Sequence, residues 1–182
     1  MKQKKHWKLI GSLSFFFILS NAFSQADSAE IRYENLFFEQ LVHSSGWLAP
    51  NKSYNGEKGF SHFLMQFSWG ELTGIKGSIS GINEQNDTLL FWEITEFASL
   101  KANETTFMQL GKIGFALGKA HYPSEKERNG TFQLGYKDGS KEEHKDRHTF
   151  IDSNTIETVS EILDPESRQW RVESILIWKR VQ

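Results

Sequence analysis

From residue 60 to the C-terminus, short segments of alternating apolar and polar residues follow one another with only short polar connections between them. An alternation with a period of two is typical of β-strands that bury one face. Parallel strands need long crossover segments, so the short connections favour an antiparallel sheet. The pattern predicts about eight strands, which cover residues 60–69, 72–83, 88–97, 105–117, 131–137, 142–151, 155–163 and 169–181.

A helical pattern precedes these strands at residues 27–43. Asp27 is suited to cap the helix, Glu30 follows three residues later, and Gly46 lies just beyond the end. At about 100° per residue, one stripe of the helix is apolar, formed by Ile31, Phe37, Phe38, Leu41 and Val42. We expect this helix to pack on the domain or to plug one end of it.

The fold class predicted from these elements is mainly β. It is an antiparallel up-and-down barrel of about eight strands preceded by one N-terminal helix. Such a barrel is just wide enough to hold one small ligand. The residues around His121-Tyr122-Pro123 are expected to form a long polar loop.

Residues 1–24 have the pattern of a cleavable signal peptide. Lysines at the start are followed by an apolar run from Leu9 to Phe23, and small residues precede a cut after Ser24. We therefore predict an exported protein, periplasmic or secreted, whose residues 25–182 form a single domain.

Composition excludes several classes of function. The net charge of −2 gives no basic footprint for nucleic acid. The apolar run in the leader is shorter than the roughly 20 residues that span a bilayer, and no later segment is long and apolar enough, so the mature chain is not expected to span a membrane. The absence of cysteine excludes disulfides and Cys-ligated metal. We expect no cofactor, and the sequence leaves the oligomeric state open.

The strand at 142–151 carries the most informative alternation. Glu143, Lys145 and Arg147 share one face, and three charged side chains on long stems should face water. The other face, with His144, Asp146 and His148, is then directed into the barrel. Buried His and Asp side chains need hydrogen bonds, water or a ligand.

This polar wall and the aromatic walls around it form the predicted ligand site. Its residues are His144, Asp146, His148, Tyr136, Trp178, Trp69 and Trp92. In the last strand the alternation directs Trp170, Val172, Leu176 and Trp178 inward. His144 and His148 are about 13 Å apart along a strand, too far to share one ion unaided, so no metal site is predicted. No catalytic residue is assigned.

The chain resembles the lipocalin-like (calycin) barrels, in particular exported bacterial members of uncharacterised function. The resemblance rests on Gly46-Trp47 after the helix, on Asp138-Gly139, on residues 147–152 and on the closing segment 177–181. Lipocalins stack an Arg from near the chain end over a Trp at the start of the first strand. The resemblance therefore implies that Arg180 stacks on Trp47.

Three functions remain open from the sequence. The first is an exported binding module for a small hydrophobic or amphipathic ligand held inside the barrel. The second is a filled structural or interaction barrel with no catalytic role. The third is a small isomerase or hydrolase-type enzyme in which Asp146 orients His144 or His148 as a general base.

Overall fold

The structure is a computed structural model that describes residues 31–56, 59–71 and 74–181. The chain divides into Met1–Ile31 and Arg32–Gln182, and the second unit carries every helix and strand described below. The predicted signal peptide and the predicted cap at Asp27 lie outside the described residues.

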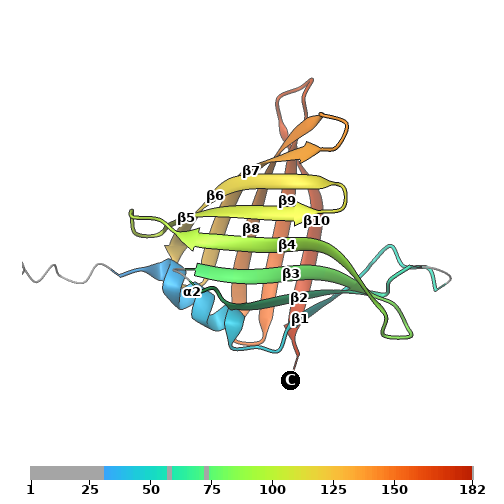
Figure 1. Ribbon diagram of the computed structural model, residues 1–182, viewed down its shortest axis with the longest axis horizontal. Coiled ribbons are helices and arrows are strands. Elements are labelled where there is room, and N and C mark those ends of the chain that lie inside the picture. The colour runs from blue at the N-terminus through green and yellow to red at the C-terminus, as the bar shows by residue number, and fades with distance from the viewer. Residues whose placement is uncertain (1–30, 57–58, 72–73, 182) are drawn as a thin grey trace, which may run out of the picture. The chain divides into compact units, whose positions relative to one another are not determined.

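Within the described residues, ten strands form one closed barrel (Figure 1). They are β1 (Trp47–Pro50), β2 (His62–Trp69), β3 (Gly74–Ile82), β4 (Thr88–Ala98), β5 (Glu104–Gly111), β6 (Gly114–Ser124), β7 (Glu127–Tyr136), β8 (Lys141–Asp152), β9 (Thr155–Leu163) and β10 (Trp170–Arg180). Each strand from β2 to β10 pairs antiparallel with the one before it, and β1 closes the ring against β10. The mainly β class and the antiparallel barrel are confirmed.

The predicted number of strands was too low. The segment 105–117 is not one strand but parts of β5 and β6, which are separated by a two-residue turn between Gly111 and Gly114. β6 also runs through His121-Tyr122-Pro123, where a loop was predicted, and buries Tyr122 inside the barrel. The short β1 had no strand-like alternation long enough to be recognised.

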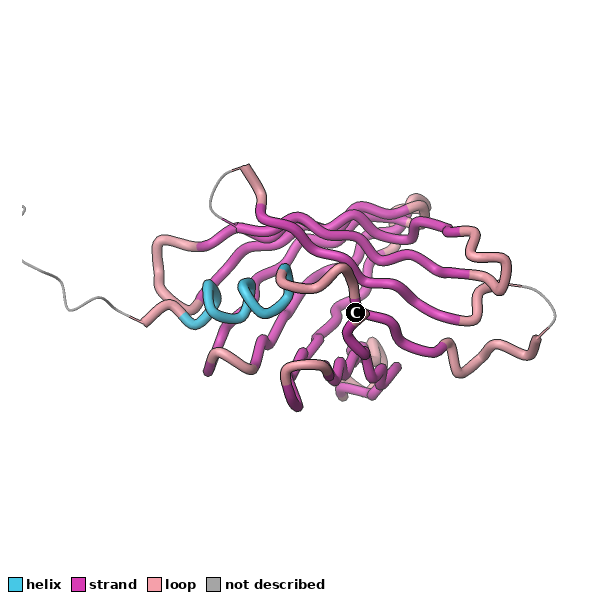
Figure 2. The backbone as a smooth tube through the Cα atoms, turned by 90° about the horizontal axis from the view of Figure 1, so that it is seen from below, coloured by secondary structure: helices cyan, strands magenta, loops and turns pink. Residues whose placement is uncertain are grey.

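In the described residues, helix α2 (Tyr33–Val42) is shorter than the predicted 27–43. Arg32 precedes it in an extended conformation and provides no side-chain cap. The helix contacts β2, β3, β6 and β7 and lies across the strand ends (Figure 2). No helix among the described residues is long and apolar enough to cross a membrane.

One apolar side of α2 seals this end of the barrel, which we call the helix end. Phe37 packs edge-on against Tyr122 and Phe150, at 5.4 and 4.9 Å between ring centroids. Phe38 contacts Tyr122 and Trp69 in the same way. Both phenylalanines are fully buried, so the interior at the helix end is filled. The opposite end, where the β7–β8 turn lies, is called the far end.

The predicted pairing of Trp47 with Arg180 is confirmed. The guanidinium of Arg180 lies 5.1 Å from the centroid of the buried Trp47 ring. Trp47 Nε1 donates to the Leu41 carbonyl at 3.2 Å, and Arg180 Nη2 donates to the Gln40 carbonyl at 3.3 Å. The pair therefore ties both strands of the β1–β10 seam to the end of α2.

The predicted faces of β8 are also as expected, whereas those of β10 are partly wrong. His144 is buried and Asp146 and His148 form contacts inside the barrel, while Glu143 and Arg147 are exposed. In β10 a bulge between Val172 and Ser174 reverses the alternation. Trp170 consequently lies under the outward-facing Lys145 and Val172 is half exposed, so neither faces the interior as predicted.

Candidate functional site

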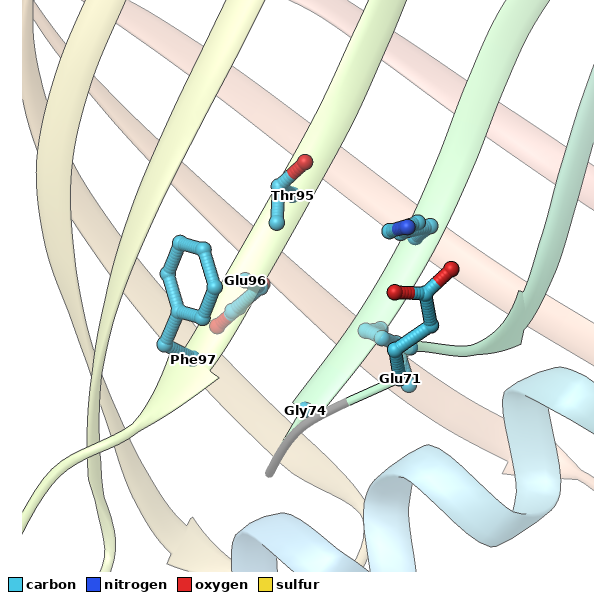
Figure 3. A pocket seen from close by; sticks show the side chains of 8 residues that line it. Glu71, Gly74, Thr95, Glu96 and Phe97 are labelled. Atoms are coloured by element: carbon cyan, nitrogen blue, oxygen red, sulfur yellow. The ribbon is translucent and has the colours of Figure 1, made fainter.

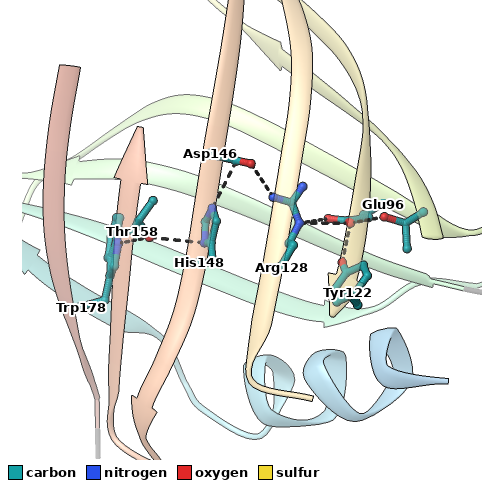
Figure 4. Close-up of polar contacts among 8 residues, drawn as sticks. Glu96, Tyr122, Arg128, Asp146, His148, Thr158 and Trp178 are labelled. Atoms are coloured by element: carbon teal, nitrogen blue, oxygen red, sulfur yellow. Dashed lines mark hydrogen bonds and ion pairs between the residues drawn. The ribbon is translucent and has the colours of Figure 1, made fainter. Parts of the chain in front are cut away.

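A chain of buried polar side chains crosses the barrel interior just above the helix end (Figure 4). Its centre is Arg128 on β7, which is 5% exposed. Arg128 Nε donates to both carboxylate oxygens of Glu96 at 3.2 and 3.1 Å, and its Nη1 donates to Asp146 Oδ1 at 2.8 Å. A buried cation between two carboxylates is compensated on both sides, which offsets its desolvation.

The backbone leaves space for the pair formed by Arg128 and Asp146. Gly130 lies directly across from Asp146 in the β7–β8 ladder. A Cβ at this glycine would lie 1.9 Å from Asp146 Oδ1 and 2.9 Å from Arg128 Nη1. The two charged groups therefore approach each other over a position that only glycine can occupy.

Glu96 joins the network from the opposite wall. It lies on β4, is 3% exposed, and accepts hydrogen bonds from Tyr122 Oη at 2.6 Å and Thr105 Oγ1 at 2.5 Å. Together with the guanidinium of Arg128, these donors satisfy the hydrogen-bonding capacity of the Glu96 carboxylate, which is shielded from water.

On its other side the network runs from Asp146 to Trp178. His148 Nε2 lies 3.2 Å from Asp146 Oδ2, and His148 Nδ1 lies 3.3 Å from Thr158 Oγ1. Trp178 Nε1, which can only donate, donates to Thr158 Oγ1 at 3.0 Å. The hydroxyl proton of Thr158 can then be given to His148 Nδ1. In that arrangement the ring proton of His148 lies on Nε2, facing Asp146.

Charge stabilises the protonation states at the centre of the network. Burial acts to raise the pKa of Asp146, but Arg128 and His148 outweigh it and hold that pKa below its ordinary value of 3.8. Burial acts to lower the pKa of Arg128, but Asp146 and Glu96 raise it well above its ordinary value. Burial, followed by the charge of Glu96, raises the pKa of Tyr122 well above 10. Asp146 is therefore ionised and Arg128 protonated.

A second polar cluster lies nearer the far end, around His144. The His144 ring stacks on Phe132, with centroids 5.2 Å apart and planes 10° apart. Its Nε2 lies 3.2 Å from Glu142 Oε2 and its Nδ1 lies 3.8 Å from Glu173 Oε2. Tyr136 Oη donates to Glu142, and this hydrogen bond is the main cause that raises the pKa of Tyr136 to about 12.

The structure thus separates the seven predicted site residues into groups. Asp146, His148 and Trp178 belong, with Thr158 as the link, to the chain of buried polar side chains centred on Arg128. We call this chain, which runs from Glu96 to Trp178, the deep network. His144 and Tyr136 belong to the second cluster through Glu142. Trp92 lies on β4 against Gly111, on the far side of Glu96 from the helix, and Trp69 lies at the helix end, half exposed against Phe38.

Above the deep network, inward-facing side chains retain access to solvent. Partial exposure is found at Phe63, Phe67, Ile79, Phe132, Ser160, Ile162 and Leu176, and the side chains of Asp146 and His148 are 10% and 17% exposed. Five of these side chains, Phe63, Phe67, Ile79, Phe132 and Leu176, pack against the buried core without being as fully buried as Phe37 and Phe38. We call the part of the interior that the partly exposed inward side chains line the lumen.

A separate hollow of about 260 Å³ lies on the outer side of the barrel between β3 and β4 (Figure 3). Thr95 and Phe97 point into it from β4, and Glu71 faces them, whereas the side chain of Glu96 points through to the interior. This hollow does not contain the polar chemistry of the deep network.

Comparisons with protein-family models, with curated proteins and with solved structures found no match. The site has to be interpreted from its own chemistry.

In this arrangement the polar groups of the deep network are hydrogen-bonded to one another. Both ring nitrogens of His148 already have partners, so neither is free to take a proton from a substrate in this arrangement. Within the described ranges, no three His, Asp or Glu side chains gather in a way that could hold a metal ion.

Sequence reasoning missed Glu96, Tyr122 and Arg128. For Arg128 a signal was present, because the alternation of Phe132, Leu134 and Tyr136 continues backwards to Gly130 and Arg128. The predicted strand began at residue 131 and stopped this extrapolation. Tyr122 was assigned to a loop, and nothing local in the sequence joins Glu96 to Arg128.

Proposed function

We propose that the protein is an exported binding module that holds a small hydrophobic or amphipathic ligand inside a lipocalin-like β-barrel. The observation that carries this proposal is the lumen: inward aromatic and aliphatic side chains above the deep network remain partly exposed. Most ligand pockets have such mainly apolar walls with a few fixed polar groups.

In this proposal the apolar part of the ligand lies between the aromatic and aliphatic walls. Phe132 on β7 and Leu176 on β10 line these walls, and Trp92 on β4 adds an aromatic surface. The polar end of the ligand is directed by His148 and Asp146 at the floor.

The other predicted residues take unequal parts in the proposal. His144 and Tyr136 contact the ligand nearer the far end, and Trp178 acts through Thr158 by orienting His148. Trp69 has no part in it, because it lies against α2 at the helix end.

Binding of the neutral amphiphile N-phenyl-1-naphthylamine tests the proposal. We expect saturable binding with micromolar dissociation constants, seen as energy transfer from tryptophan to the probe. Ser160→Phe places a ring in the lumen beside Asp146 and should weaken binding at least about tenfold. Glu161→Phe adds the same ring one residue further along, on the outer face of β9, and is the matched control.

Far-UV circular dichroism and urea unfolding establish that both variants fold. Ile79→Phe, on β3 across the barrel, repeats the test with a second ring at a partly exposed inward position. If the probe does not bind to the wild-type protein, or binds equally to the Ser160 and Ile79 variants, the ligand is not held in the lumen. The filled structural barrel then becomes the preferred interpretation.

A further inference from the structure

The outer surface of the barrel carries a broad apolar face on three adjacent strands. Its members are Phe97 on β4, Met108 and Leu110 on β5, Phe115 and Leu117 on β6, and Ile113 in the turn between β5 and β6. These six side chains are 42–56% exposed. We call them the outer apolar face.

The ladder register makes this face continuous. Leu110 lies directly across from Phe115, and Met108 lies across from Leu117. The four side chains form a block with no charge inside it. Phe97 adds to the block from β4, where its neighbour Thr95 pairs with Met108.

The area of the face is large for a monomer. With each large side chain about half exposed, the six together present on the order of 600 Å², which is the upper end for the largest patch on a monomer. A standard interface takes about 800 Å² from each partner. The outer apolar face with its polar rim is therefore large enough to form a stable interface.

Charges mark two diagonally opposite corners of the face. Glu93 on β4 lies beside Leu110, and Lys119 on β6 lies beside Thr106, four residues from Leu110 along β5. Both side chains are exposed. The line from Phe97 through Met108 to Phe115 is the other diagonal and carries only apolar side chains.

We propose that the outer apolar face is the interface of a homodimer. The two-fold axis lies in the plane between the two faces and runs parallel to the Phe97–Met108–Phe115 diagonal. Rotation about this axis superposes each protomer on the other. This rotation brings Glu93 of each protomer to Lys119 of the other. It also brings Leu110 of each protomer onto Leu117 of the other. Two copies of this chain are therefore complementary in shape and in charge, as a closed two-fold interface requires.

Sedimentation velocity on protein purified from expression of the full chain tests this interface. We expect a dimer at micromolar concentrations. Leu117→Glu puts a charge in the centre of the face and should weaken dimerisation about a hundredfold. Glu143→Lys, on the outer face of β8 away from the apolar face, is the control for a charge change and should leave the dimer unchanged.

A charge exchange tests the orientation of the two copies. Glu93→Lys and Lys119→Glu should each weaken the dimer at least about tenfold, because each places like charges together at both corners. The double variant should return to within about threefold of the wild type. Circular dichroism confirms that each variant is folded.

Three results would overturn the proposal. One is a wild-type protein that stays monomeric up to about 100 μM. A second is a double variant that is as weak as the single variants, which would mean that the two corners do not meet. The third is a monomer that co-sediments with phosphatidylcholine–phosphatidylglycerol vesicles and loses this binding in Leu117→Glu, which would assign the face to a lipid surface instead.

Discussion

At the scale of single residues, Gly130 shows how much a missing side chain can matter. The charges of Arg128 and Asp146 meet where a Cβ would otherwise lie. Two buried charges contribute to a fold only when they are close and fully hydrogen-bonded. The short distance between Arg128 and Asp146 therefore depends on the glycine as well as on the two charged residues.

Gly130→Ala should lower the free energy of unfolding by about 3 kcal/mol, because the methyl group separates Arg128 from Asp146 and leaves buried charge uncompensated. Urea denaturation at pH 7 measures the change. Thr131→Ala, the exposed neighbour on the same strand, should change the free energy by less than about 0.5 kcal/mol. A Gly130→Ala variant as stable as the wild type would show that the close approach is unimportant.

The depressed pKa of Asp146 makes a pH-dependent prediction. Because the folded-state pKa lies below the ordinary value of 3.8, the unfolded chain takes up this proton at higher pH than the folded protein does. The ion pair therefore stabilises the fold fully above pH 5. This contribution is lost progressively as the pH falls through 3.8 toward the folded pKa.

Asp146→Asn should therefore be less stable than the wild type at pH 7, by about 3 kcal/mol. The difference should become smaller when both proteins are unfolded by urea at pH 4 and then at pH 3. Comparing the two proteins cancels the titration of the other carboxylates. A difference that stays constant from pH 7 to pH 3 would contradict the assigned charge on Asp146.

At the scale of elements, the end of α2 and the seam between β1 and β10 depend on each other. β1 is four residues long and has only two register pairs with β10. The stacking of Arg180 on Trp47 and the hydrogen bonds to the last turn of α2 add side-chain contacts to this short ladder.

Arg180→Lys keeps the charge but loses the planar group that covers the indole and reaches the Gln40 carbonyl. We expect a loss of about 1–2 kcal/mol in unfolding free energy. Arg171→Lys, at an exposed position of the same strand, is the matched control and should have almost no effect. Equal stabilities for the two variants would mean that Arg180 does not hold the seam.

At the scale of the whole barrel, the ladders differ in strength. The β9–β10 ladder contains nine register pairs, against two for β1 with β10. Native-state hydrogen exchange should therefore show the amides of β1 opening by a local route at lower free energy than those of β8 and β9. Uniform protection of all ten strands would instead indicate that the barrel opens only as one unit.

The sequence determined what depends on neighbouring residues. The alternation in β8 placed His144, Asp146 and His148 inside, because successive side chains in a strand point to opposite faces. The β-rich class followed from the same local periodicity. The apolar stripe of α2 was visible as well, although the helix begins later than the predicted 27–43 in the described part of the chain.

The tertiary structure decided what depends on residues far apart in the chain. Glu96 and Arg128 are 32 positions apart and meet only because ladder register brings their strands to the same level of the barrel. The bulge in β10 reversed the faces on which Trp170 and Val172 lie, and no local sequence pattern indicated this bulge. The short β1 became a strand because β10 and β2 offered it hydrogen-bonding edges. Alternation is a property of one strand, whereas register and closure belong to pairs of strands, so only the assembled barrel could create the deep polar network.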